Sequence, residues 1–222
     1  MQISCRDRNK IALQSDILGA NALGIKNILC ITGDSVKAGD QHDTKAVHEF
    51  ESVRLLKQIQ DFNQGIDPSF GKLSDNSTNI YAGAAADPSC RNRRSLESRT
   101  RKKKEAGANF LQTQMVMDKN CLINFCKEIS NPLEIPVIAG VFLLKSYKNA
   151  LFINKYVPGA NIPERILNRL KNAQDPLKEG INIAAEQARD FINIAEGIHI
   201  MAVKAEHLIP EILEKADLNL EY

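Results

Sequence analysis

The hydrophobic and polar positions of this chain follow two alternating patterns, and their order predicts an α/β protein. Short and nearly continuous apolar runs, such as 27–32 and 137–144, are typical of strands buried on both faces of a parallel sheet. Longer segments between them, such as 10–22, carry apolar residues at helical spacing. Strands that alternate with helices in this way indicate βαβ units.

The pattern places six strands along the chain, with helices between them. We expect strands at 2–5, 27–32, 80–86, 110–117, 136–144 and 198–203. We expect helices at 10–22, 47–62, 89–106, 120–129, 146–155, 162–172, 181–195 and 207–216, with inward-facing Val47, Phe50, Val53, Leu56 and Ile59 in the second and a break at Pro158-Gly159 after the fifth. Six strands suit an open doubly wound sheet, and they also suit a (β/α)₈ barrel that lacks two units; periodicity alone does not decide between them.

Composition narrows the class of protein. With 222 residues, 43% hydrophobic residues and a net charge of +2, the chain is long enough for one good core and is neither a disulfide-stapled mini-protein nor a disordered one. No apolar run approaches the roughly 20 residues of a membrane span, and the N-terminus lacks the apolar segment of a signal peptide. The five cysteines are odd in number and form no C-x-x-C, which indicates reduced thiols of a cytoplasmic protein, mostly in its core, rather than a disulfide or metal site.

Candidate chemistry lies at the carboxyl ends of the strands, where parallel α/β proteins place their sites. The polar residues there are Cys5, Arg6, Asp7, Thr32, Gly33, Asp34, Asp87, Thr113, Gln114, Lys145 and Lys204. Asp34 is the sharpest candidate, because a carboxylate after a strand-terminal glycine can stabilise a cation or orient a ligand; it can equally cap or hold the next loop. Gln114 lies in an apolar run on the same side as Gln112, so it is either a hydrogen-bonded core amide or a ligand contact.

The absence of several catalytic and nucleotide-binding motifs excludes some enzyme classes, while a basic stretch has more than one interpretation. The chain has no G-x-G-x-x-G, Walker A, H-E-x-x-H or G-x-S-x-G motif, and its four histidines are scattered, with His199 placed as a structural hydrogen-bonding residue. The stretch 91–105 carries eight basic and two acidic residues. It reads as a solvated helix face, a phosphate contact or a nucleic-acid patch, and the lack of aromatic residues in it disfavours nucleic acid.

Several motifs, taken together, resemble the methylenetetrahydrofolate reductase family. They are ISCRDRNKIALQSDILGANALGIKNILCITGD (3–34), AGD (38–40), KKKEAGANFLQTQ (102–114), IPVIAGVFLL (135–144), VPGANIPERIL (157–167) and EGI (179–181). They cover nearly the whole chain in order, and they are most similar to the short bacterial form, which also occurs fused behind homocysteine S-methyltransferase domains.

The resemblance implies a flavoprotein of the (β/α)₈ barrel type. In that family NAD(P)H reduces FAD, and the flavin passes a hydride to 5,10-methylenetetrahydrofolate in one-carbon and methionine metabolism. We expect residues 1–222 to form one reductase-like domain with strands three to eight of the barrel, without its first two βα units, so that 2–5 and 198–203 are sheet edges. The folate ring must open to a cationic iminium, which needs a nearby carboxylate, and an acid must protonate the departing nitrogen.

The resemblance also assigns individual residues. Asp34 corresponds to the aspartate beside flavin and folate, Thr32, Gly33, Ala85 and Lys103 to flavin-binding positions, and Gln114 to the glutamine that contacts the pterin. Lys103 would lie near the phosphate-ribose arm of FAD. No metal is implied, and the implied partners are a folate substrate and either a second copy of the chain or a fused methyltransferase domain. No membrane partner is expected, and the lack of aromatic residues in the basic stretch disfavours nucleic acid.

Several positions depart from the family pattern. The general-acid glutamate lies on the first family strand, which this chain does not contain. The departures within the chain are Gln2 for a histidine, Ser35 and Val36 for prolines, His48 for an aromatic residue, Leu143 for a proline, Tyr156 for a glutamate and Ala205 for an arginine. Two classes follow: a reductase domain whose activity needs the missing strands, or a non-catalytic remnant or assembly partner. We expect weak or no flavin binding and no enzymatic turnover by the chain alone.

Overall fold

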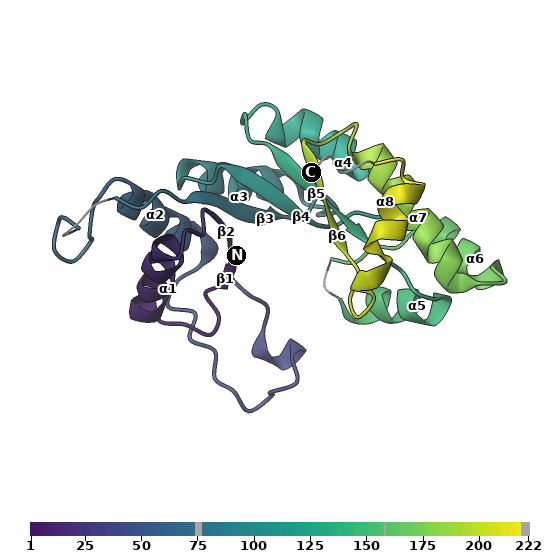
Figure 1. Cartoon of the computed structure of the whole chain (residues 1–222), viewed down its shortest axis with the longest axis horizontal. Helices are drawn as coiled ribbons and strands as arrows, with labels where there is room; N and C mark the ends of the chain where they lie inside the picture. The colour runs from purple at the N-terminus through teal and green to yellow at the C-terminus, as the bar shows by residue number, and fades with distance from the viewer. Residues whose placement is uncertain (74–76, 158, 219–222) are drawn as a thin grey trace. The chain divides into compact units, whose positions relative to one another are not determined.

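The computed structural model describes residues 1–73, 77–157 and 159–218, which contain six strands in one sheet (Figure 1). The strands are β1 (Gln2–Ser4), β2 (Asn27–Ile31), β3 (Tyr81–Ala86), β4 (Phe110–Met115), β5 (Val137–Phe142) and β6 (Gly197–Met201). The helices are α1 (Lys10–Ala22), α2 (Ser52–Asn63), α3 (Arg93–Glu105), α4 (Lys119–Phe125), α5 (Tyr147–Tyr156), α6 (Glu164–Asn172), α7 (Pro176–Phe191) and α8 (Ile209–Lys215). Short turns of helix lie at η1 (Val36–Ala38), η2 (Cys126–Ser130) and η3 (Glu206–Leu208).

The strand order decides between the two expected architectures. Neighbouring strands follow the order of the chain, from β1 to β6, and the pairs β1–β2, β2–β3 and β5–β6 are parallel. Consecutive parallel neighbours are typical of (β/α) barrels, whereas doubly wound sheets reverse direction at a switch point. The expectation of a barrel-type sheet with six βα units is confirmed, and β1 and β6 are its two ends as expected.

The chain divides into two compact units. The first comprises residues 1–85 and 97–111, and the second comprises 86–96 and 112–222. Among the described residues, no helix has the length and apolar character needed to cross a membrane.

In the first unit, α1 is fixed by local signals at both ends. The side chain of Asn9 accepts a hydrogen bond from the Ala12 backbone at 3.0 Å, and Gly24 ends the helix with a φ of 78°. Leu13 and Ile17 on its inner face are fully buried, as are Ile28 and Cys30 in the core of the same unit. The amphipathic pattern therefore predicts this helix at the residues where it forms.

The second helix begins later than its pattern indicates. It starts at Ser52, and Val47, expected to face inward, is 45% exposed. The backbone N–H of Val47 instead donates to the carbonyl of Arg6 at 2.7 Å, and His48 has a φ of 42°. A contact with the end of the first strand thus replaces the first turn of the expected helix.

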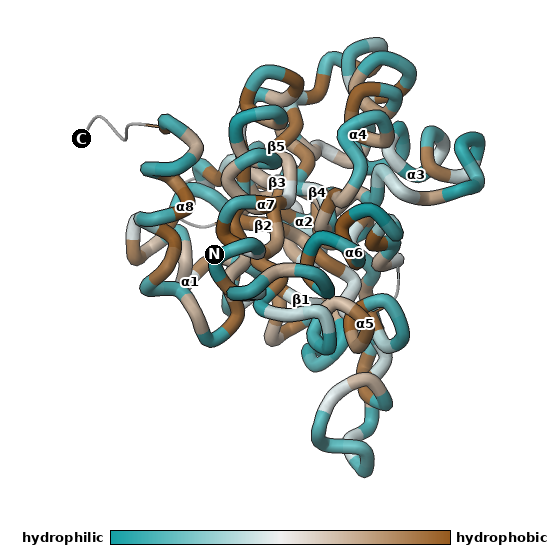
Figure 2. Tube along the Cα trace, turned by 90° about the vertical axis from the view of Figure 1, so that its right-hand side faces the viewer, coloured by the Kyte–Doolittle hydropathy of each residue, from teal (hydrophilic) through white to brown (hydrophobic). Residues whose placement is uncertain are grey.

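The second unit is built around a cluster of apolar residues from the end of β4, the segments that follow β4 and β5, and the region of helices α5–α7. Its members are Met115, Met117, Leu144, Ala150, Ile153, Ile162, Ile166, Leu167, Leu170 and Ile183. A Cβ on Gly180 would overlap the Leu144 carbonyl oxygen, so α7 packs directly against the chain that follows β5. Figure 2 shows α6 alternating between hydrophilic and hydrophobic colour, as expected of a helix with one buried face.

One helix of this unit begins well before its expected start. Helix α7 begins at Pro176, five residues before the expected start, because Asp175 caps it through the backbone N–H groups of Leu177 and Lys178. Helix α5 ends at Tyr156, while the expected break at Pro158 lies outside the described residues.

Cys5, Cys30 and Cys126 are buried and Cys90 and Cys121 half-buried, which confirms that most cysteines belong to the core.

Candidate functional site

The loop Thr32–Asp34 follows β2 in the first unit and lies against the end of β1. Gly33 has a φ of 90°, a conformation that residues with a side chain rarely adopt. A Cβ at this position would overlap the Ser4 hydroxyl and lie 2.7 Å from Cβ of Arg6. Glycine is therefore required here both by backbone conformation and by the close approach of the neighbouring strand end.

Asp34 is exposed at the tip of this loop, close enough to Arg6 for their charges to interact. The pKa of Arg6 is raised chiefly by its hydrogen bonds to Asp7, at 2.6 and 2.9 Å, and Asp34 adds to the shift through its charge. Ser35, rather than Asp34, caps the following turn η1 by accepting a hydrogen bond from Lys37. Within the described part of the chain the exposed Asp34 carboxylate thus does not cap the turn that follows it.

Thr32 connects the same loop to the start of α2. Its Oγ1 accepts a hydrogen bond from the Ser52 backbone at 3.1 Å and lies 3.3 Å from the Ser52 hydroxyl. This arrangement satisfies one of the unpaired N–H groups at the helix N-terminus. The side chain of Thr32 therefore stabilises the start of α2.

Lys103 and Ala85, both expected at a flavin site, contact each other. The Lys103 ammonium, carried by α3, donates a hydrogen bond of 2.6 Å to the carbonyl oxygen of Ala85 at the end of β3. Burial lowers the pKa of Lys103, Arg99 lowers it further, and the charge of Glu51 opposes the shift. The structure thus brings a half-buried cation to the carboxyl end of β3.

Glu51 is a residue of this region that sequence analysis did not identify. It immediately precedes α2, and its charge acts on Lys103 and also on Cys5, whose pKa is raised to about 11 mainly by burial. The apolar pattern predicted a helix over 47–62, with Glu51 inside its second turn. In the structure Glu51 instead lies at the N-terminus of α2. Carboxylates are favourable at that position because of the helix dipole.

Gln114 lies on β4 in the second unit and is exposed rather than buried. Gln112, on the same side of the strand, is half-buried, and its Nε2 lies 3.0 Å from Nδ1 of His199. Gln112 therefore takes the role of the hydrogen-bonded amide, and His199 is the structural histidine expected. Burial lowers the pKa of His199. On the opposite face, Thr113 accepts a hydrogen bond from the Gly140 N–H at 2.8 Å.

Other strand-end side chains hold loops in place. Asp87 accepts a hydrogen bond from the Ser89 backbone at 2.9 Å, and Lys145 donates to the Val203 carbonyl at 2.9 Å. Lys204, with a φ of 57°, donates from its backbone to Glu206. In the described residues no group of three or more His, Cys, Asp or Glu side chains could hold a metal ion.

The basic stretch is for the most part an exposed surface. Arg101 pairs with Glu97 one helical turn away, and Arg93 pairs with Glu128, both at 3.0 Å. Exposed pairs of this kind contribute little to stability. Lys103 differs from them because its ammonium is drawn toward β3.

Two residues that depart from the family pattern are Tyr156, where the pattern has a glutamate, and Ala205, where it has an arginine. At neutral pH neither side chain carries the charge of the residue that it replaces. Tyr156 is exposed and its ring contacts that of Phe152, with centroids 4.7 Å apart, while Ala205 is buried.

Comparison with known proteins identifies the family. The family described as methylenetetrahydrofolate reductase matches residues 1–217. A probable methylenetetrahydrofolate reductase (NADPH) from Caenorhabditis elegans is 25% identical, and methylenetetrahydrofolate reductase 2 from Schizosaccharomyces pombe is 26% identical, each over 98% of this chain. The matched regions are 32% and 35% of those proteins, so the chain spans about a third of the length of these curated relatives.

A solved structure shares the fold. It is an uncharacterised protein from Clostridium thermocellum that binds two copies of 5-methyl-5,6,7,8-tetrahydrofolic acid, with a TM-score of 0.62 and 14% identity over 98% of this chain and 71% of that one. At that identity the likeness concerns the fold alone. The match over residues 1–217 establishes more, and the chain belongs to the methylenetetrahydrofolate reductase family.

Proposed function

We propose that this chain is the flavin- and folate-binding domain of a cytoplasmic methylenetetrahydrofolate reductase. The reaction is reduction of 5,10-methylenetetrahydrofolate to 5-methyltetrahydrofolate by NAD(P)H through FAD, in one-carbon and methionine metabolism. The observation that carries the proposal is the presence of an exposed Asp34 after β2 and a half-buried Lys103 at the end of β3 in a chain of this family. The folate bound by the Clostridium thermocellum protein supports the substrate class.

The residues of the first unit fit a flavin nucleotide at two points. Lys103 uses one N–H donor on Ala85 and keeps two, which suit an oxygen of the phosphate-ribose arm. Gly33 allows the loop after β2 to lie directly against Ser4 and Arg6 at the end of β1, which leaves the neighbouring Asp34 exposed. Ala85 adds a small, half-buried side chain next to the cation.

Each assigned residue has a stated task in the reaction. FAD held by Lys103 and the loop after β2 would supply the hydride. Asp34 stabilises the cationic iminium that forms when the folate ring opens, because a carboxylate aimed at a developing positive charge lowers its energy. Gln114 is proposed to contact the pterin, since an exposed amide both donates and accepts hydrogen bonds. None of these residues is the acid that protonates the departing nitrogen.

A second candidate function is that of a non-catalytic folate-binding or assembly domain. The exposed Tyr156 and the buried Ala205 favour it, because neither can replace the charged residue that the family has at its position. Without those charges, ligand binding persists in this reading while hydride transfer is lost.

The test is anaerobic oxidation of NADH or NADPH with FAD and 5,10-methylenetetrahydrofolate, paired with a titration of FAD fluorescence. We expect no turnover by residues 1–222 alone and turnover once a polypeptide supplying the family's first two βα units is added. Asp34→Asn should abolish that turnover, whereas Asp40→Asn, an exposed carboxylate later in the same loop, should not. Absence of turnover in both mixtures would favour the non-catalytic function, and turnover insensitive to Asp34→Asn would overturn the role of Asp34.

A further inference from the structure

A cavity of about 380 Å³ lies in the second unit among α4, α6, α7 and the segment that follows β4. Its apolar wall is formed by Met117, Ile166, Ile183 and Phe191. Small-molecule sites in proteins occupy roughly 300–1,000 Å³ and combine such walls with a few polar groups. None of the residues assigned to the proposed flavin and folate chemistry lines this cavity.

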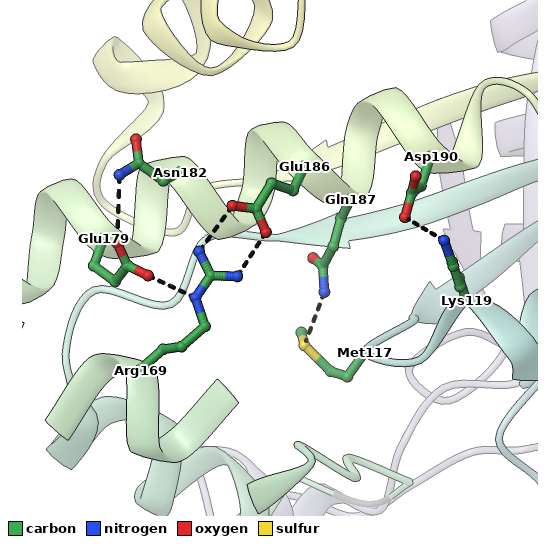
Figure 3. Close-up of polar contacts among 8 residues, drawn as sticks. All are labelled: Met117, Lys119, Arg169, Glu179, Asn182, Glu186, Gln187 and Asp190. Atoms are coloured by element: carbon green, nitrogen blue, oxygen red, sulfur yellow. Dashed lines mark hydrogen bonds and ion pairs between the residues drawn. The ribbon is translucent and has the colours of Figure 1, made fainter. Parts of the chain in front are cut away.

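One polar side chain in the cavity wall has an amide oxygen with no hydrogen-bond partner among the described residues. Gln187 of α7 is only 8% exposed, and its Nε2 lies 3.7 Å from the sulfur of Met117, a weak acceptor (Figure 3). Its Oε1 is buried and, among the described residues, has no partner. A buried amide oxygen without a donor destabilises the folded state, so this group is more than a packing element.

The rim of the cavity carries charges of both signs, most of them already paired. Arg169 binds Glu179 through Nε at 2.6 Å and Glu186 through both terminal nitrogens at 2.6 and 2.8 Å (Figure 3). Lys119 pairs with Asp190 at 3.3 Å. These pairs fix the distance between α6 and α7 and leave little charge for a ligand.

Arg165 is the cation on this rim that remains most available. Its side chain is 64% exposed, and its pairing with Asp118 is long, at 3.7 Å. It lies one turn before Arg169 on α6 and lines the same cavity. An arginine held so loosely can turn toward a carboxylate, which its planar group binds with two parallel hydrogen bonds.

We propose that this cavity binds a small organic acid that carries a planar apolar ring with an N–H group. The ring packs on the apolar wall, the N–H donates to Oε1 of Gln187, and the carboxylate binds Arg165. Each part of the ligand thus matches one feature of the site: the ring matches the apolar wall, the N–H the unpaired amide oxygen, and the carboxylate the loosely held arginine.

Three related compounds test the parts of the proposal separately on the full chain. Indole-3-acetate has the ring, the N–H and the carboxylate; 1-methylindole-3-acetate lacks the N–H, and 3-methylindole lacks the carboxylate. We expect indole-3-acetate to bind with a Kd of about 1 mM or tighter, as suits a compound of this size, and each of the others to bind roughly tenfold more weakly. Titration followed by NMR and by the thermal midpoint gives the affinities.

Two variants connect the binding to the named residues. Gln187→Leu should raise the thermal midpoint, because it removes an unsatisfied buried oxygen, and should reduce indole-3-acetate affinity about tenfold. Arg165→Met should weaken indole-3-acetate but leave 3-methylindole unchanged, and Lys178→Met, an exposed cation on α7 outside the cavity, should change neither. The proposal is overturned if indole-3-acetate does not bind, if the N-methyl compound binds equally well, or if affinity survives Gln187→Leu.

Discussion

The Nζ of Lys103 lies 2.6 Å from the carbonyl oxygen of Ala85, so a charged side chain of α3 reaches the end of β3. Burial disfavours the charged form, and Arg99 repels it, while Glu51 attracts it; the net result is a lowered pKa. A cation is thus kept in a costly environment at the strand end where the family resemblance places a phosphate-ribose arm. An anionic ligand there would offset part of that cost.

Lys103→Met should remove a pH-dependent destabilisation. Between the lowered pKa of folded Lys103 and its ordinary value of 10.5, the unfolded chain binds more protons at this residue than the folded chain. The free energy of unfolding therefore rises with pH through this window in the wild type, and this rise is absent in the variant. Urea unfolding from about pH 7 to 10.5 measures the difference between the two proteins.

Lys102→Met is the matched control, because Lys102 is the exposed neighbour on the same helix. Its curve should run parallel to that of the wild type. The buried thiols of Cys5 and Cys30, whose pKa values are raised, titrate at alkaline pH in all three proteins and cancel in the differences. A constant difference between wild type and Lys103→Met would contradict the prediction.

The helices that sequence predicts well are those fixed by local signals. Helix α1 forms over the expected residues because Asn9 and Gly24 act within one turn of its ends. The start of α2 depends instead on a bond between Val47 and Arg6, distant in sequence, which no helical periodicity can reveal. The Asp175-Pro176 pair is a local signal for the start of α7, because Asp caps helices and Pro suits their first position. The prediction instead followed the apolar pattern, which begins at Ile181.

The candidate site divides in the same way. The rule that sites follow parallel strands was enough to select Asp34, which the structure places exposed in the loop after β2; its role stays a prediction. The contact of Lys103 with Ala85 joins residues 18 positions apart through the packing of a helix on a strand, and only the family resemblance indicated it. Alternation predicted the side of β4 on which Gln114 lies, but its exposure depends on what covers that face.

Gly33→Ala should destabilise the first unit. The new Cβ would overlap the Ser4 hydroxyl and approach Cβ of Arg6 at a φ of 90°, which together cost about 1–3 kcal/mol or more in the free energy of unfolding. Gly19→Ala is the contrasting control, because Gly19 lies inside α1 with nothing within 4 Å of an added Cβ. That change should stabilise by about 0.5–1 kcal/mol. Equal effects of the two substitutions in urea unfolding would contradict the assignment.

Arg169→Met should weaken the packing of α6 on α7 in a manner that depends on acid pH. Hydrogen bonds from Arg169 lower the pKa of Glu186 below its ordinary value of 4.5, so the stabilisation exists above that value and is lost as pH falls through the lowered one. Because Glu186 is exposed, we expect a loss of no more than about 1 kcal/mol near neutral pH. Urea unfolding at neutral pH and below the ordinary pKa measures it, with Lys178→Met as an exposed control; a loss that stays constant with pH would show that packing alone is affected.

His199→Gln should flatten the pH dependence of stability just below 6.5. Burial lowers the pKa of His199, so between the lowered value and 6.5 the unfolded chain holds the proton and the folded chain does not. The free energy of unfolding of the wild type therefore rises with pH across this window, and a glutamine, which does not titrate, contributes no such rise.

The contact with Gln112 adds a spectroscopic marker, because an amide N–H donates to Nδ1 only when the ring proton is on Nε2. Nitrogen NMR should show that tautomer at neutral pH, and His207→Gln, at an exposed histidine of η3, should leave both the tautomer and the window unchanged. A His199 ring that titrates at or above 6.5, or that carries its proton on Nδ1, would contradict the packing described between β4 and β6.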